Sequence, residues 1–562
     1  MLLLEMIEEC GGIGNVTRIL SPDTRIIIEV QDTSLLPLTF SAQGDYHAVL
    51  KQVTYPKATV DCDNQGSDIN NSHSGEPAVL SLKAQLLKVG KLIAEKQVKQ
   101  AQAFIQPAIC PHRPSWHISP PQGLLNDPNG FIYHQGQYHL FYQIYPFACV
   151  HKDKYWAHLT SKDLINWQWQ SLPLTPSDYF DSHGVFSGHA LSNGDELMLF
   201  YTGNVRTEEQ RDRHTTQCLA TSTDAVHFTK QGPVIDTLPP GVTPHCRDPK
   251  IIRHQDRWLM LLGAQREDEI GRLAIYESQD LKQWTFIELC GDELGDYGYM
   301  WECPDFFTLN DQDFVVICPQ GIEADAKSHT VPHHNRILKA TLDERGSIKL
   351  SAPQVLDHGF DFYAPQSLQT IDGRRIMSAW MGLPDEINHP SSDNGWVHQL
   401  TALRQLSYEN GQLIQQPIKE LQGLRGEVVE IPASPRNFDL HSKAFELKVT
   451  MQWGSSLKLH QSEEGYCELR LDEESKVLYL DRSNTLIREG DTVRELPLSD
   501  TSTVQVHILS DNSSLELYIN NGSAVMSARI FTPATATRLS CSDKVDIDAC
   551  WMLNKPSAPF IN

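Results

Sequence analysis

The sequence predicts an all-β fold: a five-bladed β-propeller followed by a C-terminal β-sandwich, with an N-terminal extension and one amphipathic helix. Hairpin-like pairs of apolar runs recur along the chain, with starts near residues 128, 188, 249, 304 and 365. The pattern Ser-x-Asp-apolar-x-x-aromatic also recurs, at Ser161, Ser222 and Ser278. A β-rich repeat of 55 to 61 residues is typical of propeller blades, and five starts indicate five blades.

Residues 1–76 form the predicted N-terminal extension, to which we attach no function. Apolar patches such as 25–30 predict a few strands, and the Asp-, Asn-, Ser- and Gly-rich stretch 61–76 indicates a linker. Residues 77–105 are rich in Ala, Leu, Lys and Gln, and their leucines fall near helical spacing, which predicts one amphipathic helix. A helix of this kind can bind a partner, but packing on its own domain is the favoured interpretation.

The propeller is expected at 106–422 and the sandwich at 430–562. In the C-terminal part, alternating apolar and polar runs such as 444–451, 504–509 and 515–519 predict strands. Strands at this density, without helices between them, favour a β-sandwich.

Composition limits the classes of partner and cofactor. The chain of 562 residues is long enough for two or three domains. A net charge of −24 argues against nucleic acid and an anionic membrane surface as partners, and it permits a small neutral molecule. Its twelve cysteines are scattered without CxxC pairs, so they show no zinc or redox motif and are expected to be free thiols. We also expect no metal and no cofactor.

Targeting signals are not apparent in the sequence. The N-terminus lacks the basic region and long apolar run of a signal peptide, and no run of eighteen apolar residues predicts a membrane span. We therefore expect a cytoplasmic protein. The oligomeric state cannot be derived from the sequence.

The stretch 117–130 is rich in proline and glycine, so it cannot form a helix. Pro128 favours an extended conformation for Asp127, and Asn129-Gly130 indicates a turn. A single Asp before a proline is more often a residue that caps a loop than a catalytic residue, so Asp127 taken alone carries no functional assignment.

Acidic residues at three blade starts change this interpretation. Asp127 precedes Pro128, Asp248 precedes Pro249, and Glu302 lies two residues before a third proline. The first strand of each blade borders the central channel, so the three carboxylates are expected to meet in one pocket. Crowded carboxylates ionise unequally, and an ionised acid beside a protonated one can hydrolyse a glycoside. Metal binding is the competing use, but no EF-hand-like spacing is present.

The same residues carry a family resemblance. The pattern His117-x-x-Pro120 followed by Leu-Asn-Asp-Pro-Asn-Gly at 125–130 resembles the signature of glycoside hydrolase family 32, which contains invertases, sucrose-6-phosphate hydrolases and fructan hydrolases. The resemblance continues through the motifs at 179–188, 247–250, 301–305 and 361–366 and covers roughly residues 77–562. It implies a five-bladed propeller followed by a β-sandwich, in agreement with the repeats.

The resemblance also implies roles for individual residues. Asp127 would be the nucleophile that attacks the anomeric carbon of the fructosyl unit, Glu302 the general acid and base, and Asp248 the residue that stabilises the transition state. A retaining mechanism requires the first two carboxyl groups to lie about 5 Å apart. The expected substrate-binding residues are Leu124, Leu125, Asn126, Gln143, Trp156, Phe186, Ser187 and Arg247.

The sequence departs from the family pattern at the expected rim of the pocket. His151-Lys152 stands where Trp-Gly is usual, and Lys154 follows; further on, the usual Trp-Gly-His is Trp156-Ala157-His158 and the usual Phe-Ser-Gly-Ser ends in His189. His151, Lys152 and Lys154 could hold a substrate phosphate, and a solvated loop is the alternative.

These observations predict a β-fructofuranosidase that cleaves sucrose or sucrose 6-phosphate. One alternative is a fructan exo-hydrolase. Another is a non-catalytic sugar-binding propeller, against which the presence of all three carboxylates speaks. A third is that the N-terminal extension makes the chain a scaffold or a partner-controlled enzyme.

Overall fold

The chain was analysed as a computed structural model that describes residues 7–8, 11–20, 26–30, 41–43, 48–51, 82–105, 109–206, 213–323, 333–386, 388–430, 436–488, 490–499 and 502–557. The predicted linker at 61–76 lies outside these residues. Strands are the main regular structure of the described part, as the sequence predicts, and no helix in it is both long and apolar enough to cross a membrane. The cysteines in the described part are free thiols.

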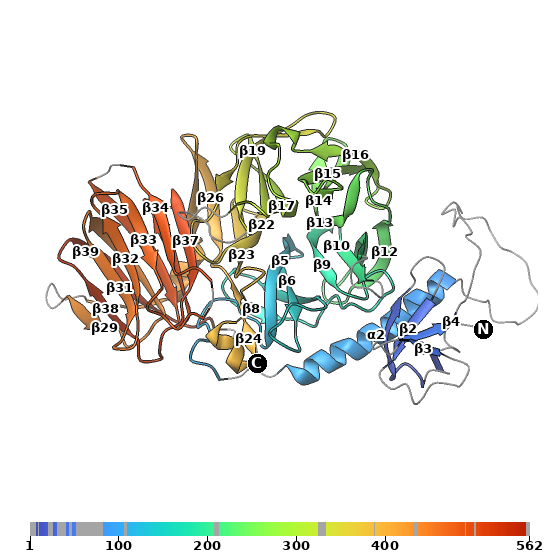
Figure 1. Ribbon diagram of the computed structural model, residues 1–562, viewed down its shortest axis with the longest axis horizontal. Helices are drawn as coiled ribbons and strands as arrows, with labels where there is room; N and C mark the ends of the chain where they lie inside the picture. The colour runs from blue at the N-terminus through green and yellow to red at the C-terminus, as the bar shows by residue number, and fades with distance from the viewer. Residues whose placement is uncertain are drawn as a thin grey trace, which may run out of the picture.

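The N-terminal region contains a small antiparallel sheet and one long helix (Figure 1). The sheet has the order β1 (Val16–Leu20), β2 (Ile26–Val30), β4 (Ala48–Lys51) and β3 (Ser41–Gln43). The helix α2 (Leu82–Phe104) buries one face, which is formed by Leu86, Val89, Ile93 and Ala101. Ala101 belongs to the core of the following sheet, so the buried face of α2 packs on its own chain.

Five antiparallel sheets follow. The first contains β5 (Gly123–His134), β6 (Gln137–Tyr145), β7 (Tyr155–Ser161) and β8 (Trp167–Trp169), with β24 (Trp396–Val397) added in parallel to β5. The second contains β9 (Val185–Asn193), β10 (Glu196–Arg206), β11 (Arg213–Ser222) and β12 (Thr229–Ile235). The third contains β13 (Val242–His254), β14 (Arg257–Arg266), β15 (Gly271–Ser278) and β16 (Thr285–Cys290).

The last two of these sheets each carry one extra short strand. The fourth contains β17 (Met300–Leu309), β18 (Gln312–Gln320), β19 (Arg336–Leu342) and β20 (Ile348–Leu350), with β21 (Gln354–Val355) beside β19. The fifth contains β22 (Tyr363–Gln369), β23 (Arg375–Met381), β26 (Arg404–Glu409) and β27 (Gln412–Pro417), with β25 (Gln399–Leu400) beside β23. Short 3₁₀ helices occur at Asp292–Leu294, Pro390–Asn394 and Lys419–Leu424.

The first strands of the five sheets form a closed ring. β5 contacts β9, β9 contacts β13, β13 contacts β17, β17 contacts β22, and β22 returns to β5. This arrangement is consistent with a propeller, and it places the starts of all five strands around one axis. Each residue that the sequence assigns to a blade start is therefore near the centre of the ring.

The repeated Ser-x-Asp pattern is a repeated turn between the third and fourth strands of a sheet. In the first sheet, Ser161 Oγ accepts a hydrogen bond from the backbone N–H of Leu164, and Asp163 accepts two from the N–H groups that follow it. The apolar residue of the pattern has a positive φ, 66° at Leu164. The same bonds and conformation recur at Ser278, so this sequence repeat has a structural cause rather than a catalytic one.

Two six-stranded sheets form the C-terminal sandwich (Figure 1). One contains β28 (Arg425–Val428), β39 (Val545–Leu553), β30 (Phe445–Gln452), β35 (Thr503–Asp511), β36 (Ser514–Ile519) and β37 (Ala524–Arg529). The other contains β29 (Asn437–Asp439), β38 (Arg538–Cys541), β31 (Ser456–Gln461), β32 (Cys467–Asp472), β33 (Val477–Asp481) and β34 (Val493–Pro497). Alternate residues of both sheets point inward and form one apolar core.

Charged side chains join the sandwich to the ring of sheets. Arg404 pairs with Asp357 and Glu516 at 2.8 Å each, and all three side chains are fully buried. His117, the first residue of the family-like signature, is bonded to Asp511 and Glu516 at 2.9 Å each. His117 therefore connects the two domains and does not contact the carboxylates of the blade starts.

Candidate active site

A cavity of about 180 Å³ lies at the centre of the ring. Nine of the sequence-predicted site residues line it, namely Asn126, Asp127, Gln143, His151, Lys154, Phe186, Arg247, Asp248 and Glu302. The structure thus brings the three carboxylates of β5, β13 and β17 together in one cavity.

Local irregularities of the strands accompany this convergence. The pairing of β5 with β6 shifts register between Leu125 and Pro128, and β13 and β17 show equivalent shifts at Asp248 and just after Glu302. Bulges of this kind redirect side chains and often occur beside active sites. Asp248 and Cys303 have positive φ values of 66° and 48°, a strained conformation for residues other than glycine. The ring of sheets around them holds this conformation in place.

Asp127 lies at the wall of the cavity and is held by two donors. Ser187 Oγ donates to its Oδ2 at 2.5 Å, and Asn126 Nδ2 donates to its Oδ1 at 3.1 Å. Gln143 in turn donates to Ser187 Oγ at 2.8 Å, so the carboxylate is oriented by a chain of polar side chains. Burial raises the pKa of Asp127, the bond from Ser187 lowers it in part, and the charge of Glu302 raises it further.

Glu302 is surrounded by donors. Arg247 donates to Oε1 through Nη2 at 2.6 Å and through Nε at 3.1 Å. Oε2 accepts bonds from Gln320 Nε2 at 2.7 Å and from the Tyr363 hydroxyl at 2.6 Å. Burial acts to raise the pKa of Glu302, but the charge of Arg247 and the hydrogen bonds from Tyr363 and Arg247 outweigh it, so the pKa lies below its ordinary value.

Asp248 is the third acid of the cavity. Its Oδ2 accepts a hydrogen bond from the backbone N–H of Cys303 at 2.9 Å. Burial raises its pKa to about 7, against the opposing charge of Arg247, and the charges of Glu302 and Asp127 raise it as well. The pKa values of the three crowded carboxylates are therefore shifted in different directions. Glu302 differs from the other two acids in that its pKa is lowered, because Arg247 and Tyr363 lie against it.

The rim segment 151–154 divides into a buried and an exposed part. Lys154 is only 7% exposed and lines the cavity, where its Nζ lies 2.8 Å from His151 Nδ1. Burial lowers the pKa of Lys154 to about 7, and the charges of Asp127 and Asp153 limit this shift. Lys152 is exposed and is not among the residues that line the cavity.

Three predicted substrate-binding residues lie behind the cavity wall. Leu124 and Leu125 are fully buried, and Leu125 belongs to the core of the first sheet. Trp156 is also fully buried, and its Nε1 donates to the backbone carbonyl of Phe186 at 3.1 Å. These three side chains do not line the cavity. Trp156 supports the backbone of Phe186, and Phe186 lines the cavity.

Sequence reasoning did not assign five of the residues that line the cavity: Arg213, Gln320, Tyr363, Trp380 and Pro384. Tyr363 lies inside the family-like motif at 361–366, so that motif could have identified it. The others belong to none of the recognised motifs, and only the folding of the ring brings them to the carboxylates.

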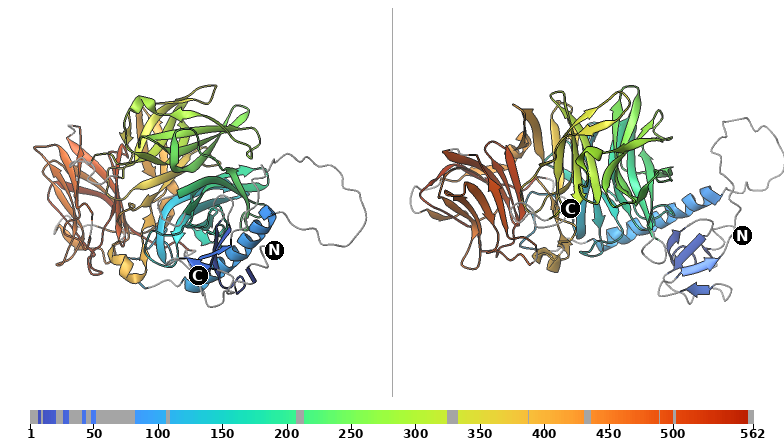
Figure 2. Two further views of the ribbon diagram at one scale, coloured as in Figure 1. Left: turned by 45° about the vertical axis from the view of Figure 1, so that its right-hand side comes forward. Right: turned by 45° about the horizontal axis from the view of Figure 1, so that its top comes forward.

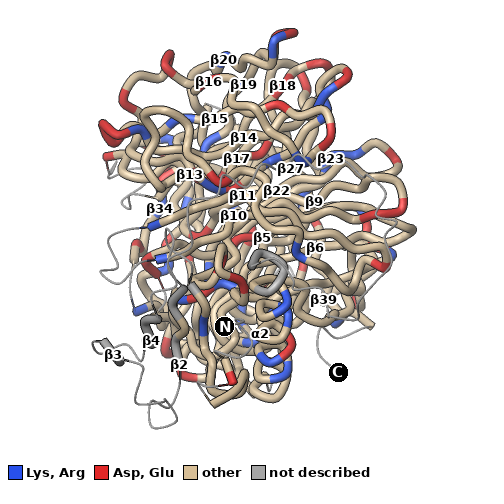
Figure 3. The backbone as a smooth tube through the Cα atoms, turned by 90° about the vertical axis from the view of Figure 1, so that its right-hand side faces the viewer, with Lys and Arg blue, Asp and Glu red and all other residues tan. Residues whose placement is uncertain are grey.

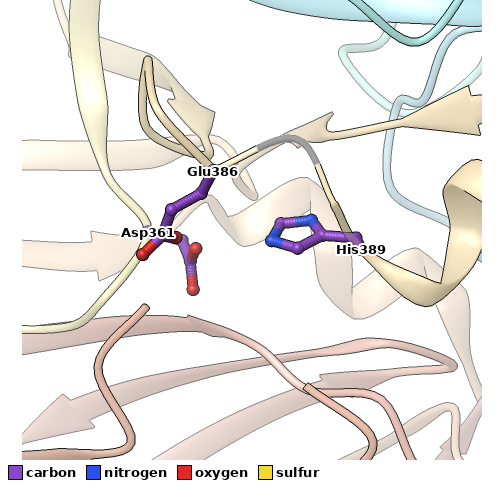
Figure 4. Close-up of side chains that lie close together, drawn as sticks. All are labelled: Asp361, Glu386 and His389. Carbon is purple, nitrogen blue, oxygen red and sulfur yellow. The ribbon is translucent and has the colours of Figure 1, made fainter. Parts of the chain in front are cut away.

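One group of described residues has a geometry that could hold a cation. Ligand atoms of Asp361, Glu386 and His389 lie within 4.8 Å of one another, and Figure 4 shows the three side chains converging. Asp361 Oδ2 already accepts bonds from Arg482 Nη1 and from a backbone N–H at 2.7 Å each. Positive charges of Arg482 and two further arginines also act on Glu386 and His389, and they oppose the entry of a cation. We therefore assign no metal to this cluster.

Comparisons with known proteins agree with this geometry. Residues 117–417 match the family model of the glycosyl hydrolases family 32 N-terminal domain, and residues 400–548 match that of the family 32 C-terminal domain. A probable sucrose-6-phosphate hydrolase of Psychromonas ingrahamii is 66% identical over the full length of both chains. The sucrose-6-phosphate hydrolase of Salmonella typhimurium is 42% identical over 77% of this chain and 91% of its own.

Solved structures show the same relationship. The sucrose-6-phosphate hydrolase of Lactobacillus gasseri has a TM-score of 0.75 at 30% identity, with 82% of this chain and 96% of that chain covered. A β-fructofuranosidase of Bombyx mori has a TM-score of 0.73 at 30% identity, with 84% and 99% covered. The family models span more than half of the chain, and the chain therefore belongs to glycosyl hydrolase family 32.

Proposed function

We propose that this chain is a β-fructofuranosidase that hydrolyses sucrose 6-phosphate, and less efficiently sucrose, to fructose and glucose 6-phosphate or glucose. The observation that carries the proposal is the meeting of Asp127, Asp248 and Glu302, from three strands, in one cavity that also contains the buried Lys154. The names of the relatives from Psychromonas ingrahamii and Salmonella typhimurium support the choice of a phosphorylated substrate.

The domain organisation belongs to the same proposal. The five sheets around the cavity are the five blades of a propeller, which occupies residues 106–422. The sandwich occupies 430–562, the helix belongs to 77–105, and residues 1–76 are an added module. A phosphorylated sugar is charged and does not cross a membrane unaided, so the cytoplasm is the proposed place of action.

Hydrolysis proceeds in two steps in this proposal. Asp127 attacks C2 of the fructosyl unit, and the bond from C2 to the leaving-group oxygen breaks while Glu302 donates its proton to that oxygen. Glu302 then removes a proton from water, whose oxygen attacks C2; the bond between C2 and Asp127 breaks, and fructose leaves with retained configuration. Ser187 and Asn126 orient the nucleophile through their bonds to its two oxygens. The separation of about 5 Å between the two carboxyl groups stays a prediction.

Arg247 controls which acid carries the proton. Its charge lowers the pKa of Glu302, which is opposite to what a general acid needs. Hydroxyl groups of a bound fructosyl unit accept hydrogen bonds from Arg247 and weaken its contact with Glu302. The pKa of Glu302 then rises and the acid becomes protonated, while Asp248 stabilises the positive charge that develops on the sugar ring.

The remaining cavity residues bind the two sugar units. Asn126, Gln143, Phe186 and Ser187 surround the fructosyl unit, with Leu124, Leu125 and Trp156 as the supporting layer. Lys154 and His151 contact the phosphate of the leaving glucosyl unit. Lys152 attracts the anion from the exposed side of the rim.

A comparison of substrates tests this function. The purified full chain should release fructose from sucrose 6-phosphate with a kcat/KM at least tenfold above that for sucrose, and it should cleave short fructans poorly. Lys154→Met should abolish most of this preference. Equal kcat/KM values for sucrose 6-phosphate and sucrose would contradict the proposed phosphate contact. A preference for fructans would favour an exo-hydrolase. Binding without turnover would overturn the proposed catalysis.

A further inference from the structure

The N-terminal sheet touches the rim of the cavity. Arg18, in β1, forms an ion pair with Asp153, which lies between Lys152 and Lys154 in the rim segment. The two side chains are only 22% and 20% exposed, so the pair is largely removed from solvent. Both family models begin after this sheet, at residue 117 and beyond, so the contact is an addition to the family fold.

Helix α2 holds the sheet in this place. Lys96 Nζ donates to the backbone carbonyls of Gly14 and Val16 at 2.8 and 3.0 Å, which fixes the start of β1 on the helix. Gln97 Nε2 donates to the carbonyl of Pro176 at 3.2 Å, and this bond ties the helix to the loop before β9. Figures 2 and 3 show α2 and the N-terminal sheet together on one side of the ring. Helix α2 therefore contacts both β1, which contains Arg18, and the ring of sheets, and these contacts set the position of Arg18.

The electrostatic consequence falls on Lys154. Asp153 is an acid in a segment that is proposed to receive a phosphate, and its negative charge acts on Lys154. Unpaired, Asp153 would repel a phosphate monoester dianion. The guanidinium of Arg18 cancels this charge and leaves the positive charges of the rim to act on the substrate. The contact is partly desolvated, so the effect is not lost to screening as it is at an open surface.

We propose that Arg18 is a specificity-determining residue, which selects sucrose 6-phosphate over sucrose by neutralising Asp153 at the rim of the cavity. This inference rests on the proposed function, because it requires the phosphate to bind near Lys154. Arg18 is a positioning residue that acts through Asp153 and takes no part in the chemistry.

Variants of the full chain test the inference through steady-state kinetics with both sugars. Arg18→Ala should raise KM for sucrose 6-phosphate about tenfold, the effect expected for one uncompensated charge at a partly buried site, and should change KM for sucrose less than twofold. The value of kcat should stay the same for both substrates. Arg18→Lys should retain most of the preference, because it keeps the positive charge.

The double variant separates charge from structure. If Arg18 acts by cancelling the charge of Asp153, Arg18→Ala combined with Asp153→Asn should restore KM for sucrose 6-phosphate to within about threefold of the parent value. Lys91→Ala is the matched control, since Lys91 is an exposed cation on α2. It should leave both KM values unchanged, and the thermal midpoint of each variant checks its folding.

Several outcomes would overturn the inference. Arg18→Ala could raise KM for both substrates equally, which would show a purely structural role. Alternatively, KM for sucrose 6-phosphate could stay as high in the double variant as in Arg18→Ala. A parent enzyme without preference for sucrose 6-phosphate would overturn both the proposed phosphate contact and this inference. If the parent prefers the phosphorylated sugar and loses this preference in Lys154→Met but not in Arg18→Ala, only the inference falls.

Discussion

The cavity and the junction between propeller and sandwich both bury carboxylates, but the positive charges around these carboxylates differ. At the junction, Asp357 and Glu516 are paired with Arg404, and Asp511 is bonded to His117. Despite burial, these bonds hold the pKa values of Asp511 and Glu516 below their ordinary range. The junction thus uses buried charges in matched sets, which favours one fixed arrangement of the two domains.

The cavity brings three acids together and pairs them unequally with positive charges. Arg247 Nη2 lies 2.6 Å from Glu302, whereas Arg247 Nε lies 3.9 Å from Asp248. Burial raises the pKa values of Asp127 and Asp248, while the closer contact with Arg247 helps to lower that of Glu302. Such an arrangement costs stability, but it produces groups that exchange protons near neutral pH. The comparison shows that pairing, rather than burial itself, separates a structural carboxylate from a reactive one.

The largest effect is expected at the cavity. Asp127→Asn should lower kcat/KM by on the order of 10⁴-fold or more, because it removes the nucleophile. It should leave the thermal midpoint unchanged or raise it, because it relieves repulsion with Glu302. Release of fructose and thermal unfolding measure the two effects. A clear loss of stability would mean that Asp127 is a structural carboxylate like those at the junction.

At the junction, the expected effect is a loss of stability while kcat is retained. Arg404→Met should lower the free energy of unfolding by roughly 3–5 kcal/mol, because it leaves Asp357 and Glu516 buried without their partner. Urea unfolding measures this loss, and the folded enzyme should keep its kcat. The control is Arg488→Met, since the pair of Arg488 with Asp393 is exposed and contributes little to stability. Equal costs for the two variants would contradict the comparison.

Removal of Arg247 should take away the positive partner of Glu302, so that this acid no longer resembles the paired carboxylates of the junction. Arg247→Met should lower kcat/KM roughly 10²–10³-fold, because a donor to the sugar is lost. With its positive charge gone, the pKa of Glu302 rises, so the basic limb of the pH–rate profile should move to higher pH. Rates measured between pH 4 and 9 test this shift. An unchanged basic limb would show that Arg247 does not tune Glu302.

The smallest expected effect concerns the pH dependence of stability. Burial acts to lower the pKa of His117, but its bonds to Asp511 and Glu516 outweigh this and raise the pKa above 6.5. Protonated His117 therefore contributes fully below about pH 6.5, and its contribution fades as the pH rises through the raised pKa. His117→Asn should flatten the thermal midpoint between pH 6 and 9. His227→Asn, at an exposed pair, is the control and should leave the profile unchanged.

Much of the cavity could be predicted from the sequence because its residues occupy equivalent positions in repeated units. Asp127 and Asp248 directly precede the proline of a blade start, and Glu302 lies two residues before one. The ring of first strands brings these positions to one centre. Gln320 and Trp380 lie on β18 and β23 without any such marker. Their contribution depends on how neighbouring sheets pack, which a local pattern does not contain.

By itself, the sequence determined the all-β fold, the family motifs and the identity of the three carboxylates, because each follows from short-range patterns repeated along the chain. Only the tertiary structure decided which side chains lose their water and which charges become neighbours. It buried Lys154 beside Asp127 while leaving Lys152 exposed, assigned His117 to the domain junction, and brought Arg18 to Asp153 across 135 residues. Burial and charge pairing between distant segments depend on packing in three dimensions, and they set the pKa values on which the chemistry rests.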